Sequence, residues 1–420
     1  MRYAWGKEMA EKKGERAKTE TGIKNRILME MLVSALGGMQ WNGEGVSQAA
    51  AEQVYEMADR HAVLSVVAEK FFIYPLLENR AREVCRRTSL RSYHLLFLTK
   101  YVVGTLRERG IETVVLKGVS TAFYYREPEL RKSGDVDLQL LDPSRIHEAE
   151  RTLKQKGFRT NPQQDANHHL SMFSPDGIEV ELHIMLAEPF DNAEVNQYLE
   201  RLVQELGQHT QDREIMGVCL PVFSDGVQAY HLLIHMLQHF LRAGFGLKLL
   251  CDWAVFWNRH VDEEECALYR RLTADTGLEN FSRMVTSVCV DHLGLRIRED
   301  SRPCDELFSE ADEESFWKDI LEAEEFGRGD AKRMVVLRDS GLKGYLREFH
   351  HQMHLNFPRA GKCFLLFPAL WLVTLARFLR NNRKVRDVSL MQVLETADRR
   401  SRQMELLDLF RRNCGHGGEQ

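Results

Sequence analysis

The stretch VVLKGVSTAFYYREPELRKSGDVDLQLL, residues 114–141, decides the fold, because the spacing of apolar residues changes within it. Residues 113–116 form a short, apolar, β-branched run, which predicts a buried strand. Residues 135–141 alternate between polar and apolar side chains, which predicts a strand with one buried face. Between these strands, Lys117 and Gly118 occupy a turn that leads into a short helix. The stretch therefore predicts the start of a small sheet.

The sheet is predicted to continue downstream. Residues 142–144, Asp-Pro-Ser, form a turn into a helix that Gly157 closes. The runs HHLSMF at 168–173 and IEVELHIML at 178–186 are separated by Ser-Pro-Asp-Gly, a strong hairpin signal. Residues 111–187 therefore predict a small mixed sheet with one or two helices.

Both flanks of this sheet have helical periodicity, from residue 25 to about 109 and again from about residue 192. Residues 299–326 are strongly acidic, which is typical of a solvated helix pair or linker. The fold class is therefore α+β, a small mixed β-sheet core between predominantly α-helical N- and C-terminal regions. We expect a mobile basic arm (1–24), an N-terminal helical region (25–110), the sheet core (111–190), a helical region packing on the core (191–298), an acidic linker or helix pair (299–330) and a C-terminal helical region (331–420).

The composition excludes several classes of protein. The 420-residue chain is 44% hydrophobic and 28% charged, which is typical of a soluble globular protein. Its formal charge of −5 argues against nucleic acid as a partner. None of its eight cysteines forms a CxxC pair, which argues against a zinc ribbon or a disulfide framework. Scattered thiols and an N-terminus without a signal-peptide pattern predict a cytoplasmic location.

One apolar segment raises the question of membrane contact. Residues 363–376, CFLLFPALWLVTLA, are fewer than the roughly 20 residues that a bilayer requires. A buried helix is the favoured interpretation. Because basic residues follow as far as position 386, peripheral contact of residues 363–386 with anionic lipid is the less favoured alternative.

The chemically suggestive residues lie on the predicted strands. Alternate residues of a strand face the same side, so Asp135 and Asp137 share a face, as do Glu179, Glu181 and His183. If the two strands are neighbours, three or four carboxylates crowd one sheet face, which is repulsive unless a cation neutralises it. Oxygen ligands in this number favour Mg²⁺ or Mn²⁺.

Lys117 and Gly118 provide a candidate phosphate site upstream of these carboxylates. Glycine permits a phosphate to approach the backbone closely, and the following helix N-terminus offers amide donors. Lys117 supplies a positive charge. A phosphate site followed by two aspartates and a third carboxylate is suited to metal-assisted phosphoryl or nucleotidyl transfer.

Together these motifs resemble the uncharacterised nucleotidyltransferase family of the DNA-polymerase-β superfamily. That family pairs a Lys-Gly turn with an Arg-x-x-x-Asp-x-Asp strand and a later Glu-Leu-His strand. The resemblance covers residues 111–187 firmly and the helical flanks weakly, and it departs from the superfamily's usual Gly-Ser turn because Val119 follows the glycine. The matching positions are Lys117, Gly118, Arg131, Asp135, Asp137, Glu181 and His183.

The resemblance implies a role for each matched residue. Asp135 and Asp137 would hold two Mg²⁺ (or Mn²⁺) ions and Glu181 would complete the site, as a metal ligand or as the base for an acceptor hydroxyl. Lys117 and the Gly118 amide would contact phosphates of a nucleoside triphosphate.

Two of the matched residues have alternative roles. Arg131 would either neutralise the leaving pyrophosphate or brace Asp135, and both roles stay open. His183 is expected to be a packed or supporting residue. The implied reaction moves a nucleoside monophosphate, AMP from ATP by preference, to a hydroxyl of an unknown small molecule or protein.

Other polar groups rank lower. His231, His235 and His239 recur every four residues, but no HExxH glutamate accompanies them, so a polar helix face is favoured over a zinc site. Asp252 lies in an apolar helical run and is expected to be a buried, paired acid.

Two alternative functions stay open. One is a metal-dependent glycosyltransferase that uses the Asp-x-Asp pair on a sugar nucleotide, although the preceding Lys-Gly turn and the following acidic strand fit it less well. The other is a non-catalytic nucleotidyltransferase-like antitoxin or assembly protein, against which the intact carboxylates Asp135, Asp137 and Glu181 argue.

Overall fold

The computed structural model describes most of the chain up to residue 325. The described residues are 22–38, 40–162, 168–190, 192–242, 244–296 and 308–325, together with 350, 353, 367, 369–374, 403 and 405–410. Most of the predicted basic arm, most of the segments 331–420 and 363–386, and both ends of the segment 299–330 lie outside the described residues. The last three positions of the predicted arm, residues 22–24, begin a helix that runs to residue 37.

The N-terminal part is helical, as the apolar spacing predicts. After the helix over residues 22–37, the chain forms α2 (Gln48–Arg60), α3 (Leu64–Val67), the 3₁₀ helix η1 (Ala68–Phe71) and the long α4 (Glu78–Arg107). The side chain of Ser47 caps α2 by accepting a hydrogen bond from the Ala50 amide. Gly110, with a φ of 68°, lets the chain leave α4 and enter the sheet.

The predicted strands form part of one mixed sheet in the order β3-β4-β5-β2-β1-β7-β6. Neighbouring strands are antiparallel except for the pairs β2–β5 and β1–β7, which are parallel. The α+β fold class is therefore confirmed, and the Ser-Pro-Asp-Gly segment joins β4 to β5 as predicted. The strands predicted from sequence are β1 (Thr113–Val115), β2 (Val136–Leu140), β4 (His169–Phe173) and β5 (Glu179–His183). Shorter elements between them are α5 (Val119–Ala122), η2 (Pro128–Leu130), η3 (Pro143–Arg145), α6 (Ile146–Gln155) and β3 (Arg159–Thr160).

The expectation of an uninterrupted helical pattern from residue 192 is wrong at one place. After α7 (Ala193–Glu205) and η4 (Leu206–His209), the strands β6 (Thr210–Ile215) and β7 (Val218–Phe223) form a hairpin and extend the sheet. Val222 of β7 pairs with Val115 of β1, so this strand is specified by tertiary pairing with a strand more than a hundred residues earlier.

The rest of the C-terminal part is helical. It comprises α8 (Asp225–Arg242), α9 (Leu247–Trp257), α10 (Glu263–Thr276), α11 (Glu279–Leu293) and α12 (Glu310–Ala323). Helix α12 lies in the acidic segment and begins with a capping box between Ser309 and Asp312. Phe316 and Ile320 of α12 are buried in the main hydrophobic core, so one face of this acidic helix packs against the protein rather than facing solvent.

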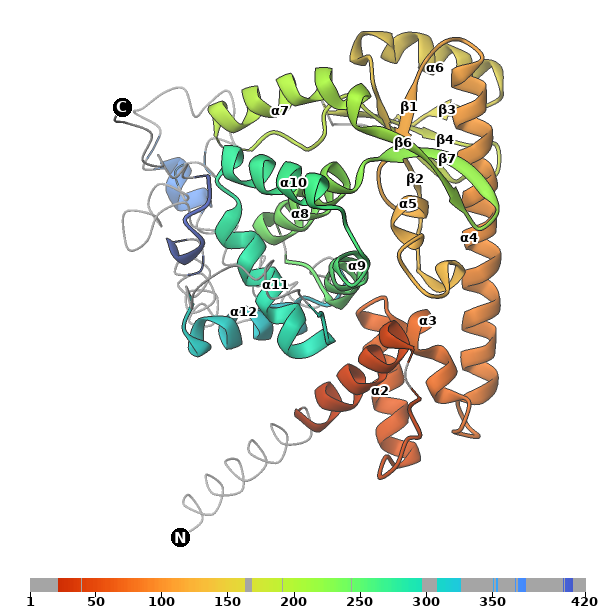
Figure 1. Cartoon of the computed structure of the whole chain (residues 1–420), viewed down its shortest axis with the longest axis vertical. Helices are drawn as coiled ribbons and strands as arrows, with labels where there is room; N and C mark the ends of the chain where they lie inside the picture. The colour runs from red at the N-terminus through yellow and green to blue at the C-terminus, as the bar shows by residue number, and fades with distance from the viewer. Residues whose placement is uncertain are drawn as a thin grey trace.

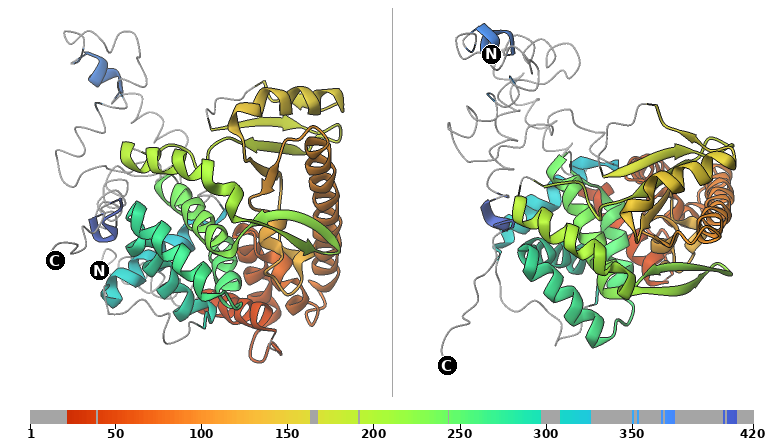
Figure 2. Two further views of the ribbon diagram at one scale, coloured as in Figure 1. Left: turned by 45° about the horizontal axis from the view of Figure 1, so that its top comes forward. Right: turned by 90° about the horizontal axis from the view of Figure 1, so that it is seen from above.

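Strand alternation divides the sheet into an apolar face and a mixed face. The side chains of Val136, Leu138, Val180 and Leu182 are buried in a cluster with residues of α4 and α6. Figures 1 and 2 show α4 running along this side of the sheet, with the helices α8 to α12 gathered on the other side. Each fully buried aliphatic side chain contributes about 1.5–3 kcal/mol to the stability of the fold. Because this burial fixes which side of β2 and β5 faces α4 and α6, it also fixes which residues face α8 and α9 on the opposite side. The mixed face contains the predicted site.

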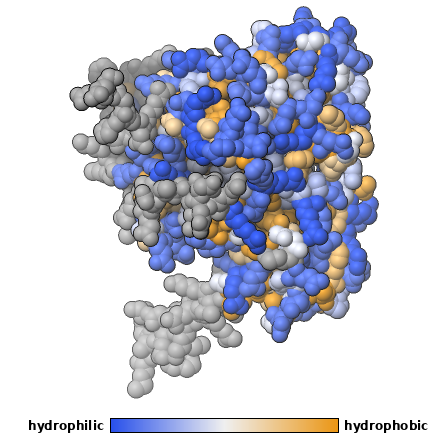
Figure 3. Space-filling model, viewed as in Figure 1, coloured by the Kyte–Doolittle hydropathy of each residue, from blue (hydrophilic) through white to orange (hydrophobic). Residues whose placement is uncertain are grey.

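The surface and the helices give no sign of a membrane-spanning segment in the described ranges. No helix there is both long enough and apolar enough to cross a bilayer. Figure 3 shows hydrophilic residues over most of the described surface on the face in view, with apolar residues in small groups.

Candidate functional site

The candidate site begins with the pairing of β2 and β5. These strands are parallel neighbours, and their register places Asp137 opposite Glu181 and Gln139 opposite His183. The condition that the sequence left open, that the two carboxylate-bearing strands be adjacent, is therefore met. Because side chains alternate along each strand, these residues lie on the face that α8 and α9 cover.

Asp137 is the most buried carboxylate of this group. Its side chain is fully shielded from solvent, and its Oδ1 lies 3.2 Å from Nζ of Lys117 and 3.2 Å from Nε2 of His183. Burial disfavours the charge, but Lys117 and the hydrogen bond from His183 outweigh it and hold the pKa of Asp137 well below its usual range. Its second oxygen, Oδ2, is buried and has no hydrogen-bond partner within the described residues. Asp137 is thus an ionised carboxylate with one unused oxygen.

The charges of the neighbouring carboxylates also shift the pKa values of Asp135 and Lys117. The charge of Asp137, together with burial, raises the pKa of Asp135 to about 6. Burial lowers the pKa of Lys117, but the charges of Asp137, Asp135 and Glu181 outweigh it and raise that pKa above its usual value. The carboxylates of Asp137, Asp135 and Glu181 therefore all act on the Lys117 ammonium group.

Glu181 contacts two histidines. Its Oε2 lies 3.2 Å from Nε2 of His183, and its Oε1 lies 3.7 Å from Nε2 of His169 on β4. Burial lowers the pKa of His183, but the hydrogen bonds to Asp137 and Glu181 outweigh it and raise that pKa. His183 therefore faces both carboxylates rather than packing among apolar side chains.

The Lys-Gly turn has the backbone conformation that requires glycine. Gly118 has a φ of 65° and precedes the four-residue helix α5. Its carbonyl accepts hydrogen bonds from the Ala122 amide at 3.1 Å and from Nη1 of Arg131 at 3.2 Å. The turn that carries Lys117 is thus held in place by Arg131.

Arg131 is buried and paired with Asp252 of α9. Its Nε and Nη2 donate to the two carboxylate oxygens of Asp252, each at 2.7 Å, and Tyr125 donates to the same carboxylate at 2.8 Å. The side chains of Arg131 and Asp252 are 5% and 2% exposed. These contacts favour the bracing role, with Gly118 rather than Asp135 as the group that is braced, and nucleotide contact by Arg131 stays a prediction. Asp252 is the buried, paired acid that the sequence predicted.

The three histidines of α8 also approach this face. Burial and the charge of Lys117 lower the pKa of His231 to about 3 and that of His239 to about 4, and the pKa of His235 is well below its usual value for the same reasons. All three are therefore neutral near pH 7. They form a polar but uncharged helix face against the site, as expected.

Sequence reasoning missed two groups at the site. His169 was visible only as one half of a His-His pair in a strand, and although the Ser-Pro-Asp-Gly turn predicted that β4 pairs with β5, nothing in the sequence showed that the His169 side chain lies beside Glu181. Lys248 lies in the mainly apolar helix α9, where burial and the Arg131 charge lower its pKa to about 8, against the charges of Asp252 and Asp135. The available signal was a lysine in a helix whose other charged residue is Asp252.

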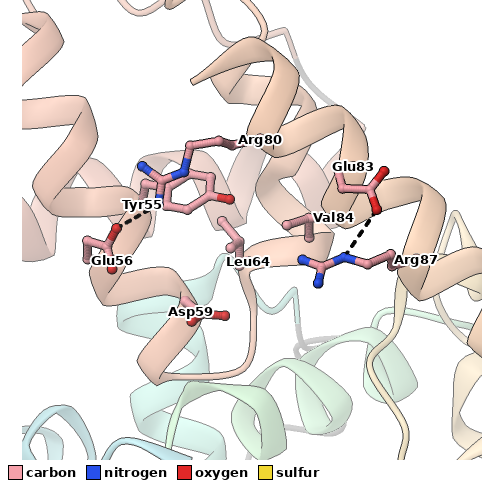
Figure 4. A pocket seen from close by; sticks show the side chains of 8 residues that line it. All are labelled: Tyr55, Glu56, Asp59, Leu64, Arg80, Glu83, Val84 and Arg87. Carbon is pink, nitrogen blue, oxygen red and sulfur yellow. Dashed lines mark hydrogen bonds and ion pairs between the residues drawn. The ribbon is translucent and has the colours of Figure 1, made fainter. Parts of the chain in front are cut away.

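A hollow of about 290 Å³ lies elsewhere, between α2, α3 and α4. Figure 4 shows its charged side chains paired with one another, Arg80 with Glu56 and Arg87 with Glu83. These charged side chains are largely exposed, and none belongs to the predicted site.

Comparison with known proteins gives one family and one structure. A family model described as an uncharacterised nucleotidyltransferase matches residues 47–294. No curated protein matches. The crystal structure of an antigenic nucleotidyltransferase-like protein from Paracoccidioides brasiliensis is similar with 18% sequence identity and a TM-score of 0.30, over 50% of this chain and 96% of that chain. A TM-score this low carries no structural argument.

Proposed function

The chain belongs to the uncharacterised nucleotidyltransferase family, and from this premise we propose that it is a metal-dependent enzyme of the polymerase-β-like type. The proposed reaction transfers a nucleoside monophosphate, AMP from ATP by preference, to a hydroxyl group of a small molecule or protein. Asp135, Asp137 and Glu181 are the proposed catalytic residues.

The observation that carries this proposal is the parallel register of β2 and β5. It sets Asp137 opposite Glu181, and Asp135 lies directly before the strand that carries Asp137. Carboxylates gathered in this way repel one another, as the raised pKa of Asp135 indicates. Such an arrangement is understandable if a cation is bound between them during the reaction.

The residues present fit a divalent cation. Asp135, Asp137 and Glu181 supply oxygen ligands, and the buried Oδ2 of Asp137 is a ligand atom with no hydrogen bond to lose within the described part of the chain. These three residues would hold Mg²⁺ or Mn²⁺. When bound, the metal supplies charge stabilisation for the transferring phosphate and lowers the pKa of the acceptor hydroxyl.

The other residues act on the substrate directly or position those that do. Lys117, whose side chain is 23% exposed, is proposed to bind the triphosphate oxygens, and the Gly118 amide to contact the same phosphates. The Arg131–Asp252 pair keeps the turn in place. Glu181 is proposed to accept the proton of the acceptor hydroxyl.

The experiment is a label-transfer assay with nucleoside triphosphates. The purified protein is incubated with Mg²⁺ and with each triphosphate labelled either at the α- or at the γ-phosphate, alone and with fractions of metabolites and proteins. Nucleotidyl transfer moves the α label to an acceptor and releases unlabelled pyrophosphate, and mass spectrometry identifies the adduct. The Asp135→Asn, Asp137→Asn double variant is the inactive control.

Each alternative gives a different outcome. Transfer of the γ label would indicate a kinase, and transfer of a hexose from a sugar nucleotide would indicate the glycosyltransferase. Equal pyrophosphate release by the wild type and the double variant, with every triphosphate, would refute the proposal and favour a non-catalytic protein.

A further inference from the structure

Beyond the carboxylates, the same sheet face carries a group of nitrogen ligands. His169 on β4 and His183 on β5 are directly opposite each other in the antiparallel pairing of these strands. With Glu181 they offer three ligand atoms that all lie within 4.8 Å of one another. Their side chains are 15%, 10% and 19% exposed, so the group is mostly shielded yet accessible to a small ion.

The separations between these atoms are close to those of ligands around one metal ion. Nε2 of His183 lies 3.2 Å from Oε2 of Glu181, and Nε2 of His169 lies 3.7 Å from Oε1. Metal–ligand bonds of about 2.0–2.2 Å place neighbouring ligand atoms of a tetrahedral or octahedral site about 3.0–3.5 Å apart. Small rotations of the side chains, together with loss of the Nε2 proton that His183 donates to Asp137, would bring all three into coordination.

A neighbouring histidine orients the ring of His169. Nδ1 of His169 lies 2.8 Å from Nε2 of His168, and His168 in turn lies 3.5 Å from Oε1 of Glu188. The same Nε2 of His168 makes both contacts, so the proton lies either on that atom or on Nδ1 of His169; in the second case His169 donates to His168, and its own Nε2 lone pair is free to bind a metal ion. Metal-binding histidines in proteins are commonly held through the second ring nitrogen in this way.

We propose that His169, Glu181 and His183 form a divalent metal site that binds Mn²⁺ or Zn²⁺ in preference to Mg²⁺. Imidazole nitrogen is a good ligand for Zn²⁺ and other transition metals, whereas Mg²⁺ favours an all-oxygen shell that retains water. Asp135 and Asp137 offer oxygen ligands alone, and Glu181 is shared between them and the two histidines, so the two halves of the face differ in the metal they select. The inference concerns metal binding and holds whether or not the chain transfers nucleotides.

The test measures metal binding without any reaction. Full-length protein is stripped with a chelator and titrated with Mn²⁺, and free Mn²⁺ is followed by its electron paramagnetic resonance signal. Pulsed measurements on the bound ion then report coupling to ¹⁴N, which histidine ligation produces and carboxylate ligation does not. Competition with Mg²⁺ and with Zn²⁺ gives the order of preference.

Matched variants locate the ligands. His169→Gln should weaken Mn²⁺ binding about tenfold or more and reduce the ¹⁴N coupling, while changing Mg²⁺ affinity far less. His147→Gln, at an exposed position of α6, is the control and should leave both affinities unchanged. Thermal melts verify that each variant folds. If His169→Gln does not fold, the ¹⁴N coupling of Mn²⁺ bound to the wild type decides whether histidine is a ligand.

The outcomes separate this inference from the proposed function. Bound Mn²⁺ without ¹⁴N coupling, or equal Mn²⁺ affinities in the two variants, would overturn the site while leaving nucleotidyl transfer intact. Nitrogen-coupled Mn²⁺ in a protein that transfers no label would support the site and count against the proposed function alone.

Discussion

The role of Arg131 can be decided by breaking its pair with Asp252. In Asp252→Asn the guanidinium keeps its position, 5% exposed, but loses a carboxylate whose two oxygens each lie 2.7 Å from its nitrogens. Removing one partner of a buried ion pair costs about 3–5 kcal/mol, because the remaining charge stays desolvated. Asparagine retains one acceptor oxygen, so we expect a loss of about 3 kcal/mol in the free energy of unfolding.

The assay is urea unfolding near pH 7, with an exposed ion pair as the control. Glu56 and Arg80 lie 2.9 Å apart, but their side chains are 57% and 54% exposed, so Glu56→Gln should cost less than about 1 kcal/mol. The double variant Arg131→Met, Asp252→Asn removes both charges and should cost less than the sum of the two single changes, Arg131→Met and Asp252→Asn.

The bracing argument predicts a specific pattern of effects. Both Arg131→Met and Asp252→Asn should destabilise the protein, and each should weaken nucleotide binding because the turn at Gly118 loosens. The reasoning is refuted if Asp252→Asn costs no more than Glu56→Gln. If Arg131→Met lowers nucleotide affinity without any loss of stability, Arg131 contacts the nucleotide directly.

Three further perturbations address the charged face. Lys117→Met removes the ammonium group 3.2 Å from Asp137, so calorimetry should show about a tenfold or greater loss of triphosphate affinity, equivalent to about 1.4 kcal/mol. Glu181→Gln should abolish transfer of the α label, whereas Glu179→Gln, two residues earlier on the same face of β5, should retain most of it. The pKa of Asp135 is raised to about 6 from an unfolded value near 3.9, so the folded state holds this proton more tightly than the unfolded state does. The metal-free wild type should therefore lose stability, relative to Asp135→Asn, as the pH rises from about 4 through 6. Thermal melts of both proteins in chelator, at a series of pH values, measure this loss. If the pKa of Asp135 were normal, the difference in melting temperature between the two proteins would stay constant over this range.

The sequence predicted which side chains of β2 and β5 share a face, because strand alternation is a local property. In β2, the apolar residues Val136 and Leu138 specify which side is buried, and that alone places Asp135 and Asp137 together on the other side. The same reasoning placed Glu181 with His183 on β5. Only the adjacency of the two strands had to be assumed, and the structure supplies it.

The contacts that sequence reasoning missed are non-local. Arg131 and Asp252 pair across 121 positions of the chain, and no spacing rule connects a basic residue after a 3₁₀ turn with an acid in an apolar helix. The β6–β7 hairpin was missed for a similar reason. Pro221 interrupts its apolar run, which argues against a strand inside a sheet, and only the pairing of Val222 with Val115 reveals β7 as an inner strand.

The two faces of the sheet explain how a repulsive site persists in a stable fold. Like charges about 4 Å apart cost about 4 kcal/mol at the effective dielectric of a protein surface, which is a large fraction of a domain's net stability. A slip of β5 by one residue would relieve that repulsion, but it would also turn Val180 and Leu182 out of the apolar cluster. Each of these fully buried side chains is worth about 1.5–3 kcal/mol, as are Val136 and Leu138 on β2, so burial on one face outweighs repulsion on the other. The apolar face therefore holds the carboxylates in place, and in the proposed function a bound cation would relieve their repulsion.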